Sequence, residues 1–243
     1  MFLEGLRLCE EGAQSGVAIT AVFYTSDFAL EARGKALLTE LKNRDIHPLI
    51  IPEKILDSIT DTRSPQGIVI LAKKPQSGGD DLSARIGENS NSLSLVVVLH
   101  EMNNPSNLGA VLRTAEAAGA AGAIITSNSA DPFSSKALRG AMGASLRLPV
   151  WYGAEFAEAV EWAKRNKMAV ACAAVQAGLS YLEIDWQKPH ALVIGSEAHG
   201  LSAEEIALCD ESFSIPMEAP VESLNAAVAA GIILFEARRA VIT

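Results

Sequence analysis

The second half of the chain alternates between apolar runs of strand length and segments whose apolar residues recur at helical spacing. Strands that alternate with helices in this way form a parallel sheet covered by helices on both faces. We therefore predict an α/β fold with a mostly parallel sheet for residues 93–243. The expected strands are residues 95–99, 123–126, 148–151, 168–174, 191–194 and 213–215, and the expected helices are residues 108–118, 134–142, 154–166, a short segment from 203, and 223–239.

The first 75 residues show the same kind of pattern on a smaller scale. Apolar runs at residues 18–24, 48–51 and 67–72 read as strands, the last one after the turn-forming sequence Ser64-Pro65-Gln66-Gly67. Helical spacing between them predicts two helices. Residues 76–92 are polar and rich in turn formers, with only a short possible helix at residues 82–86. We predict a small α/β domain of residues 1–75, a linker of residues 76–92 and a larger domain of residues 93–243.

Composition indicates a globular protein without a membrane or secretory role. Of the 243 residues, 49% are hydrophobic and 20% charged, which is enough to fill a sizeable core. We find no apolar stretch of transmembrane length and no signal-peptide pattern at the start. Cys9, Cys172 and Cys209 are unclustered and do not fall at metal-ligand spacing with the histidines. We expect reduced thiols, no metal site and a cytoplasmic location.

The formal net charge of −9 argues against a nucleic-acid partner, because phosphate contacts need Lys and Arg. The charges are unevenly distributed, however. Residues 102–147 carry more basic than acidic side chains: Arg113, Lys136, Arg139 and Arg147 against Glu116 and Asp131. A small positive site on an acidic body is compatible with this distribution, although composition alone favours scattered, solvated charges.

Three separated polar turns adjoin these apolar runs. The first, Asn103 through Thr114, leaves an expected strand and enters a helix, where Asn107 can cap the helix and Gly109 allows close backbone approach. Arg113 would then lie in the second turn, among small or apolar neighbours that hold it near other protein. A plain capping role for Asn107 and a solvated position for Arg113 are the simpler alternatives.

The second turn runs from Ile194 to Ser202 and the third from Ile215 to Asn225. In the second, Gly195 and Gly200 bracket Glu197, for which a solvated carboxylate is the simpler alternative. A solvent-facing turn is the commoner setting for His199, so we leave it out of the site. In the third, Ser223 or Asn225 can start a helix whose first half is almost entirely small residues and can pack close to other backbone.

Together and in this order, the three turns resemble the motifs of the SpoU (TrmH-like) branch of the SPOUT RNA methyltransferases. The resemblance implies a trefoil-knotted α/β domain that binds S-adenosylmethionine, forms a homodimer and methylates the 2′ oxygen of a ribose in rRNA or tRNA. It assigns catalytic roles, assembled across the dimer, to Asn107, Arg113, Glu197, Ser223 and Asn225. It assigns cofactor contacts to Thr126, Ile194, Gly195, Ser196, Ile215, Met217 and Leu224.

The same resemblance extends to residues 1–75, which look like an L30e-like substrate-binding domain through Phe2 to Glu11 and the Ser64 to Gly67 turn. Ala219-Pro220, where relatives usually have glycine, and Ala227, where serine is frequent, depart from the pattern. In this family the arginine that matches Arg113 has been proposed as the general base, yet a guanidinium stays protonated. Stabilisation of a developing alkoxide fits it better, and the identity of the base stays open.

Two other classes of function compete with this interpretation. One is a catalytically idle RNA-binding or ribosome-associated module that retains the fold, which the acidic charge favours slightly. The other is a nucleotide-type small-molecule enzyme, for which the chain carries neither a Gly-x-Gly-x-x-Gly nor a Walker sequence.

Overall fold

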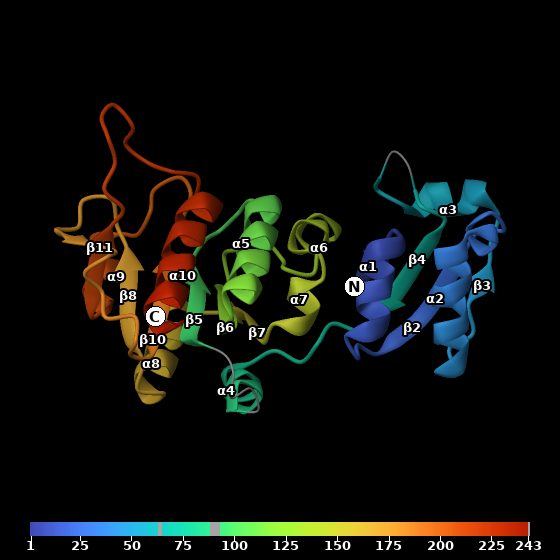
Figure 1. Ribbon diagram of the computed structural model, residues 1–243, viewed down its shortest axis with the longest axis horizontal. Coiled ribbons are helices and arrows are strands. Elements are labelled where there is room, and N and C mark those ends of the chain that lie inside the picture. Colours follow the sequence, from blue (N-terminus) through green and yellow to red (C-terminus); the bar gives the residue numbers. More distant parts are fainter. Residues whose placement is uncertain (63–64, 88–92, 243) are drawn as a thin grey trace.

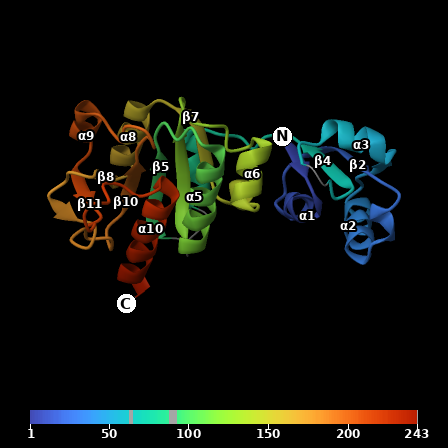
Figure 2. The ribbon, with the colours of Figure 1, turned by 90° about the horizontal axis from the view of Figure 1, so that it is seen from above.

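The computed structural model describes residues 1–62, 65–87 and 93–242. The molecule is elongated, with two sheets of different size side by side along its long axis (Figures 1 and 2). The smaller sheet has four strands from the first 72 residues, and the larger has seven strands from residue 93 onward.

The smaller sheet has the order β1-β4-β2-β3. Strand β4 (Ile68–Ala72) pairs antiparallel with β1 (Phe2–Glu4) and β2 (Ile19–Tyr24), and β2 pairs parallel with β3 (Leu49–Ile50). Helices α1 (Leu6–Gln14), α2 (Ala32–Asn43) and α3 (Glu53–Ile59) and the short 3-10 helix η1 (Phe28–Leu30) complete this part. The sequence pattern predicts β2, β3, β4, α2 and α3 but not β1 and α1. Ser64 of the predicted turn lies outside the described residues.

The expected linker contains a helix that packs as part of the larger unit. Helix α4 (Gly79–Gly87) buries Leu82 beside Trp151 and Trp162. The indole Nε1 of Trp162 donates to the carbonyl oxygen of Gly79 at 2.9 Å and to Oγ of Ser83 at 3.0 Å. The first part of residues 76–92 is therefore anchored because its helix supplies an apolar side chain to the core. Residues 88–92 of the predicted linker lie outside the described residues.

The larger sheet has the order β7-β6-β5-β10-β8-β11-β9, and every pairing recorded among the described residues is parallel. The prediction of a mostly parallel sheet is confirmed. Only β9 lacks a counterpart among the predicted strands. The strands are β5 (Leu93–Leu99), β6 (Ala120–Thr126), β7 (Val150–Ala154), β8 (Ala169–Ala173), β9 (Leu179–Ser180), β10 (His190–Ile194) and β11 (Glu211–Ser214).

Helices cover both faces of this sheet, as alternate side chains of β5 show. Leu95, Val97 and Leu99 pack into one core with α5 (Pro105–Ala118), α6 (Ser135–Ala141), α7 (Ala144–Arg147) and α10 (Ala226–Ile242). Val96 and Val98 point to the other face, into a core with α4, α8 (Phe156–Arg165) and α9 (Ala203–Leu208). A strand buried on both faces reads as a continuous apolar run, which is the pattern seen in the sequence.

Two helix starts differ from expectation. Helix α5 begins at Pro105, and its cap is Asn104, whose Oδ1 accepts from the Ser106 backbone amide at 2.9 Å. The prediction that Asn107 caps this helix is wrong, because proline at the first helical position needs no amide partner and lets the helix begin earlier. Helix α10 begins at Ala226 and is capped by Asn225, one of the two expected starts, whereas Ser223 precedes it.

Helices α5 and α6 cross at unusually short range. A Cβ placed on Gly109 would lie 2.3 Å from the carbonyl oxygen of Ala137 and 2.8 Å from the amide nitrogen of Ala141. The close approach predicted at Gly109 is therefore made by α6. Helix α10 lies along α5 on its other side, where a Cβ on Gly231 would meet only the Thr114 methyl at 3.7 Å.

The small unit rests on α6, α7 and the turn before them. Phe133, Leu138 and Leu146 belong to the same apolar cluster as Leu3 and Leu8. Ion pairs surround that cluster: Lys74 with Asp131 at 2.6 Å, Arg139 with Glu4 at 3.7 Å, and Arg147 with Glu11. This contact joins the unit of the smaller sheet to α6 and α7, which pack against α5. Among the described residues, no helix has the length and apolar character needed to cross a bilayer.

Candidate active site

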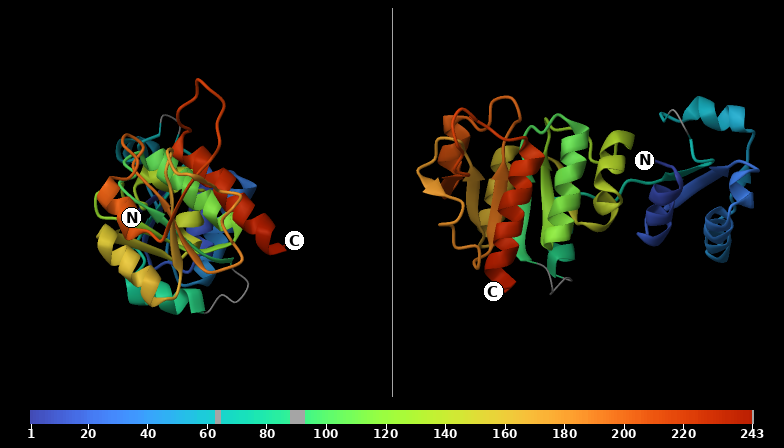
Figure 3. Two further views of the ribbon diagram at one scale, coloured as in Figure 1. Left: turned by 90° about the vertical axis from the view of Figure 1, so that its left-hand side faces the viewer. Right: turned by 45° about the horizontal axis from the view of Figure 1, so that its top comes forward.

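The three polar turns meet at one edge of the larger sheet. Ile194 at the end of β10 pairs with Leu99 at the end of β5, and Leu99 pairs with Ile125 of β6. Because parallel strands present their carboxyl ends together, the segments that follow them share this edge, which is where open α/β sheets bind ligands. Figure 3 (right) shows the segments before α5 and before α10 at the same end of the sheet.

Asn107 and Glu197, from the first and second turns, make a direct contact. The side-chain amide of Asn107 donates a hydrogen bond to Oε1 of Glu197, across 90 positions of sequence. Asn107 is half-buried in the first turn of α5, and Glu197 is exposed in the loop after β10. The structure therefore brings these two predicted residues together, and it gives Asn107 a role other than capping.

Arg113 does not have the surroundings expected from its neighbours. It lies in the third turn of α5 and is exposed, with no side-chain partner in the part of the chain that the structure describes. The expectation that protein encloses it is wrong for a single chain, because α5 turns Leu112 and Ala115 to the core and Arg113 outward. The next residue, Thr114, faces Gly231 of α10, so Arg113 is one sequence position from the contact between α5 and α10.

The third turn contributes Ser223 and Asn225 differently. Oδ1 of Asn225 accepts from the backbone amides of Ala227 at 2.9 Å and Val228 at 3.3 Å, which caps α10. Ser223 is exposed, and within the described ranges its hydroxyl contacts no partner. The structure records no contact of Arg113, Ser223 or Asn225 with the pair formed by Asn107 and Glu197.

The predicted cofactor residues of the third turn lie in a segment whose backbone amides are partly free of hydrogen bonds, whereas those of the second turn lie in or beside a closed loop. Residues 215–225 form neither helix nor strand, and the backbone amides of Met217 and Leu224 have no partner among the residues described. In the second turn, Ser196 and Gly200 exchange two backbone hydrogen bonds that close the loop. Free amides at the carboxyl edge of a parallel sheet suit a ligand held by backbone groups, as expected of residues Ile194, Gly195, Ser196, Ile215, Met217 and Leu224.

Gly195 and Thr126 have structural roles at this edge of the sheet. A Cβ on Gly195 would lie 2.8 Å from the carbonyl carbon of Gly200, so the loop itself fills the space that glycine leaves. Thr126 is buried at the end of β6, and its Oγ1 accepts from the backbone amide of Glu101 at 3.1 Å. Their cofactor contacts remain predictions.

Sequence reasoning missed a histidine at this edge. His100, 6% exposed, follows β5, and its Nε2 lies 2.8 Å from Oε1 of Glu205 in α9. Glu205 also accepts from the Ser202 amide at 2.7 Å. Burial raises the pKa of Glu205, but the Ser202 amide and His100 outweigh it and hold this pKa below its ordinary value. The Ser202-x-x-Glu205 capping box was visible in the sequence, whereas nothing local to His100 signalled its partner.

Comparison with known proteins adds independent findings. Residues 94–235 match the model of the SpoU rRNA methylase family, and residues 2–78 match the model of the RNA 2′-O ribose methyltransferase substrate-binding domain. The chain is 31% identical to an uncharacterised tRNA/rRNA methyltransferase of Synechocystis, over 98% of this chain and 84% of that protein. It is 30% identical to the 23S rRNA (guanosine(2553)-2′-O)-methyltransferase RlmP of Bacillus subtilis, over 97% and 87%.

Among solved structures, the chain resembles the SpoU methyltransferase AviRb from Streptomyces viridochromogenes in complex with AdoMet. The TM-score is 0.87 at 25% identity, covering 100% of this chain and 91% of that one. The likeness and the parallel sheet confirm the predicted fold class.

Proposed function

Because this chain belongs to the SpoU rRNA methylase family, we propose that it transfers a methyl group from S-adenosylmethionine to the 2′ oxygen of a ribose in RNA. The match over residues 94–235 carries this conclusion. The relative RlmP, named above as a 2′-O-methyltransferase, and the AdoMet-bound AviRb structure support both the reaction and the cofactor.

The cofactor fits the edge of the larger sheet. When bound, S-adenosylmethionine supplies a methyl group already activated on a sulfonium. The free amides of Met217 and Leu224 and the closed loop from Gly195 to Gly200 would hold it through backbone groups. The remaining task of the protein is to align the ribose oxygen and to favour its alkoxide character.

Within the catalytic cluster, each polar side chain has a separate task. The guanidinium of Arg113 stabilises negative charge on the ribose oxygen, since it stays protonated and cannot serve as a base. Glu197 is fixed by the Asn107 amide and presents its carboxylate at the same edge. Asn225 holds the start of α10 in place, and Ser223 beside it is free to contact the RNA.

We further propose a homodimer formed through α10. Val228, Ile232 and Phe235 lie on one face of this helix and are 52%, 36% and 51% exposed. Large apolar side chains gathered at helical spacing on a surface mark an interface. Because α10 packs along the helix that carries the exposed Arg113, a second subunit bound through α10 would supply the enclosure that a single chain lacks.

We assign RNA recognition to the small domain, residues 1–75, and methyl transfer to residues 93–243. The match of residues 2–78 to a substrate-binding model supports the first assignment. The substrate is rRNA or tRNA, and the cytoplasmic location expected from the unpaired cysteines stays a prediction.

The test uses labelled S-adenosylmethionine with unmodified rRNA and tRNA transcripts. We expect labelled 2′-O-methyl nucleosides from the wild-type chain and none from Arg113→Ala, which retains cofactor binding in calorimetry. Label on a base would overturn the reaction type. Absence of cofactor binding together with retained RNA binding would identify a catalytically idle module instead.

A further inference from the structure

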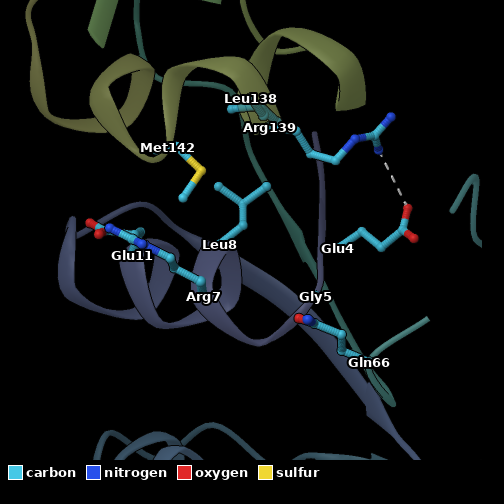
Figure 4. A pocket seen from close by; sticks show the side chains of 9 residues that line it. All are labelled: Glu4, Gly5, Arg7, Leu8, Glu11, Gln66, Leu138, Arg139 and Met142. Carbon is cyan, nitrogen blue, oxygen red and sulfur yellow. Dashed lines mark ion pairs between the residues drawn. The ribbon is translucent and has the colours of Figure 1, made fainter. Parts of the chain in front are cut away.

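A cavity lies where the small domain meets the methyltransferase domain. Its volume is about 200 Å³, and it opens between α1 and α6 (Figure 4). The three side chains of Leu8, Leu138 and Met142 gather at its centre. Arg139 and Glu4 flank them on one side, and Arg7 and Glu11 on the other.

The carboxylates beside this cavity are already engaged. Glu4 accepts from the backbone amides of Asp61 at 3.2 Å and Thr62 at 3.1 Å, and its side chain is only 2% exposed. Glu11 pairs with Arg147. Backbone amides thus hold the Glu4 carboxylate by hydrogen bonds, and Arg147 is shared between Glu11 and Glu116. The rim of the cavity therefore carries carboxylates with fixed partners as well as guanidinium groups.

The guanidinium groups are less well satisfied. Arg7 is exposed and has no partner among the described residues. Arg139 reaches Glu4 only at 3.7 Å, and its buried Nη1 makes no hydrogen bond within the described part of the chain. Oε1 of Gln66 accepts from the Leu6 amide at 2.9 Å, which leaves the two amide hydrogens of Gln66 available as donors. The cavity thus combines an apolar centre with donors at its rim.

We propose that this cavity binds one unstacked nucleobase of the RNA substrate, while Arg7 and Arg139 contact the phosphates on either side of it. The inference rests on the proposed function and names how that substrate is held. A planar base would lie over Met142 and the exposed edge of Leu8, with the buried Leu138 beneath them, and the Gln66 amide would donate to an acceptor on the edge of the base.

The volume and the position of the cavity favour a single nucleobase as its ligand. Pockets for drug-sized ligands begin at about 300 Å³, so this smaller cavity suits a single ring system. Proteins recognise RNA sequence mainly through unpaired bases that leave the stack, and arginine is the side chain best shaped to hold a phosphate. The cavity also lies between α1 of the small domain and α6 of the methyltransferase domain, where an RNA that contacts both domains can reach it.

Two variants test the proposal in the full-length protein. Met142→Phe fills the cavity with a ring, and Arg7→Gln removes a rim charge without touching the core. Arg165→Gln on α8, also exposed, is the matched control for the arginine change. The probes are unmodified 16S rRNA, 23S rRNA and tRNA transcripts, with labelled S-adenosylmethionine.

We expect each cavity variant to raise KM for RNA by about tenfold, equivalent to about 1.4 kcal/mol of binding. The value of kcat, the Kd for S-adenosylmethionine and the melting temperature should stay at wild-type values, and Arg165→Gln should change nothing. Transcripts containing 4-thiouridine should cross-link to peptides that contain residues 4–11 or 138–142.

The inference is overturned if both variants keep the wild-type KM, or if the cross-links fall only on other segments. Failure of the proposed function has a different signature, since the wild-type chain would then methylate none of the transcripts. In that event the Kd of each variant for the same transcripts, measured by filter binding, still decides whether the cavity takes part in RNA binding.

Discussion

The amide of Asn107 in α5 donates to the carboxylate of Glu197 in the loop after β10, and so joins two turns that are 90 positions apart in sequence. Asn107 lies in the first turn of the helix that carries Arg113, and Glu197 lies in the expected cofactor loop. The hydrogen bond thus holds the expected cofactor loop against the start of α5.

A double-mutant cycle measures this coupling. We expect Asn107→Ala and Glu197→Ala each to lower the single-turnover rate of methyl transfer, and the double variant to be no slower than the worse single one. The reason is that each change removes the same contact, whose coupling we place at about 1 kcal/mol, near the net value of an ordinary hydrogen bond. Losses that multiply would show that the two residues act independently.

The crossing of α5 and α6 predicts opposite outcomes at two glycines. Gly109→Ala should lower the free energy of unfolding by about 1–3 kcal/mol, because the added methyl group overlaps the α6 backbone. Gly231→Ala should raise it by about 0.5–1 kcal/mol, because the space is open there and alanine favours a helix. Urea denaturation followed by circular dichroism provides both values. Equal effects at the two positions would contradict the tight crossing.

Periodicity in the sequence was sufficient to predict the parallel sheet, because buried strands read as short apolar runs whatever their partners. It missed β1, η1, α7 and β9, which have only two to four residues each. It also missed α1, whose buried face includes the small residues Gly12 and Ala13. Local pattern also favoured Asn107 as a cap, since it directly precedes the apolar run from Leu108, although Asn104 followed by Pro105 is the stronger start signal. The contacts of Asn107 with Glu197 and of His100 with Glu205 depend on strand order, which no local pattern encodes.

The contact between His100 and Glu205 predicts how the melting temperature changes at acid pH. The folded state holds the pKa of Glu205 below its ordinary value, so this carboxylate stabilises the fold above the unfolded pKa, about 4.3. That contribution is lost as the pH falls from there through the lower, folded pKa. We expect Glu205→Gln to flatten the decline of melting temperature below about pH 4.3. The control is Glu204→Gln, at the neighbouring exposed position. An equal decline of the melting temperature in both variants would show that Glu205 makes no special contribution.

The apolar face of α10 predicts a dimer that a single charge disrupts. We expect Phe235→Glu to sediment as a monomer, because burying an unpaired carboxylate in an apolar interface is costly. Val175→Glu, at an apolar position that is 61% exposed elsewhere on the protein, should sediment like the wild-type chain. Analytical ultracentrifugation distinguishes the two results. A monomeric wild-type protein would remove the basis for this interface.

Mixing inactive subunits tests whether the catalytic cluster spans the dimer. If Arg113 of one subunit acts with Glu197 of the other, a heterodimer of Arg113→Ala and Glu197→Ala subunits retains one intact site of its two. Random exchange makes half of the dimers mixed, so the mixture should recover roughly a quarter of the wild-type methylation rate. If both side chains serve one site within a single subunit, every site in the mixture lacks one of them and no activity returns. The exposure of Arg113 in the isolated chain favours the shared site, because a guanidinium that must act beside a ribose oxygen needs surroundings that exclude water.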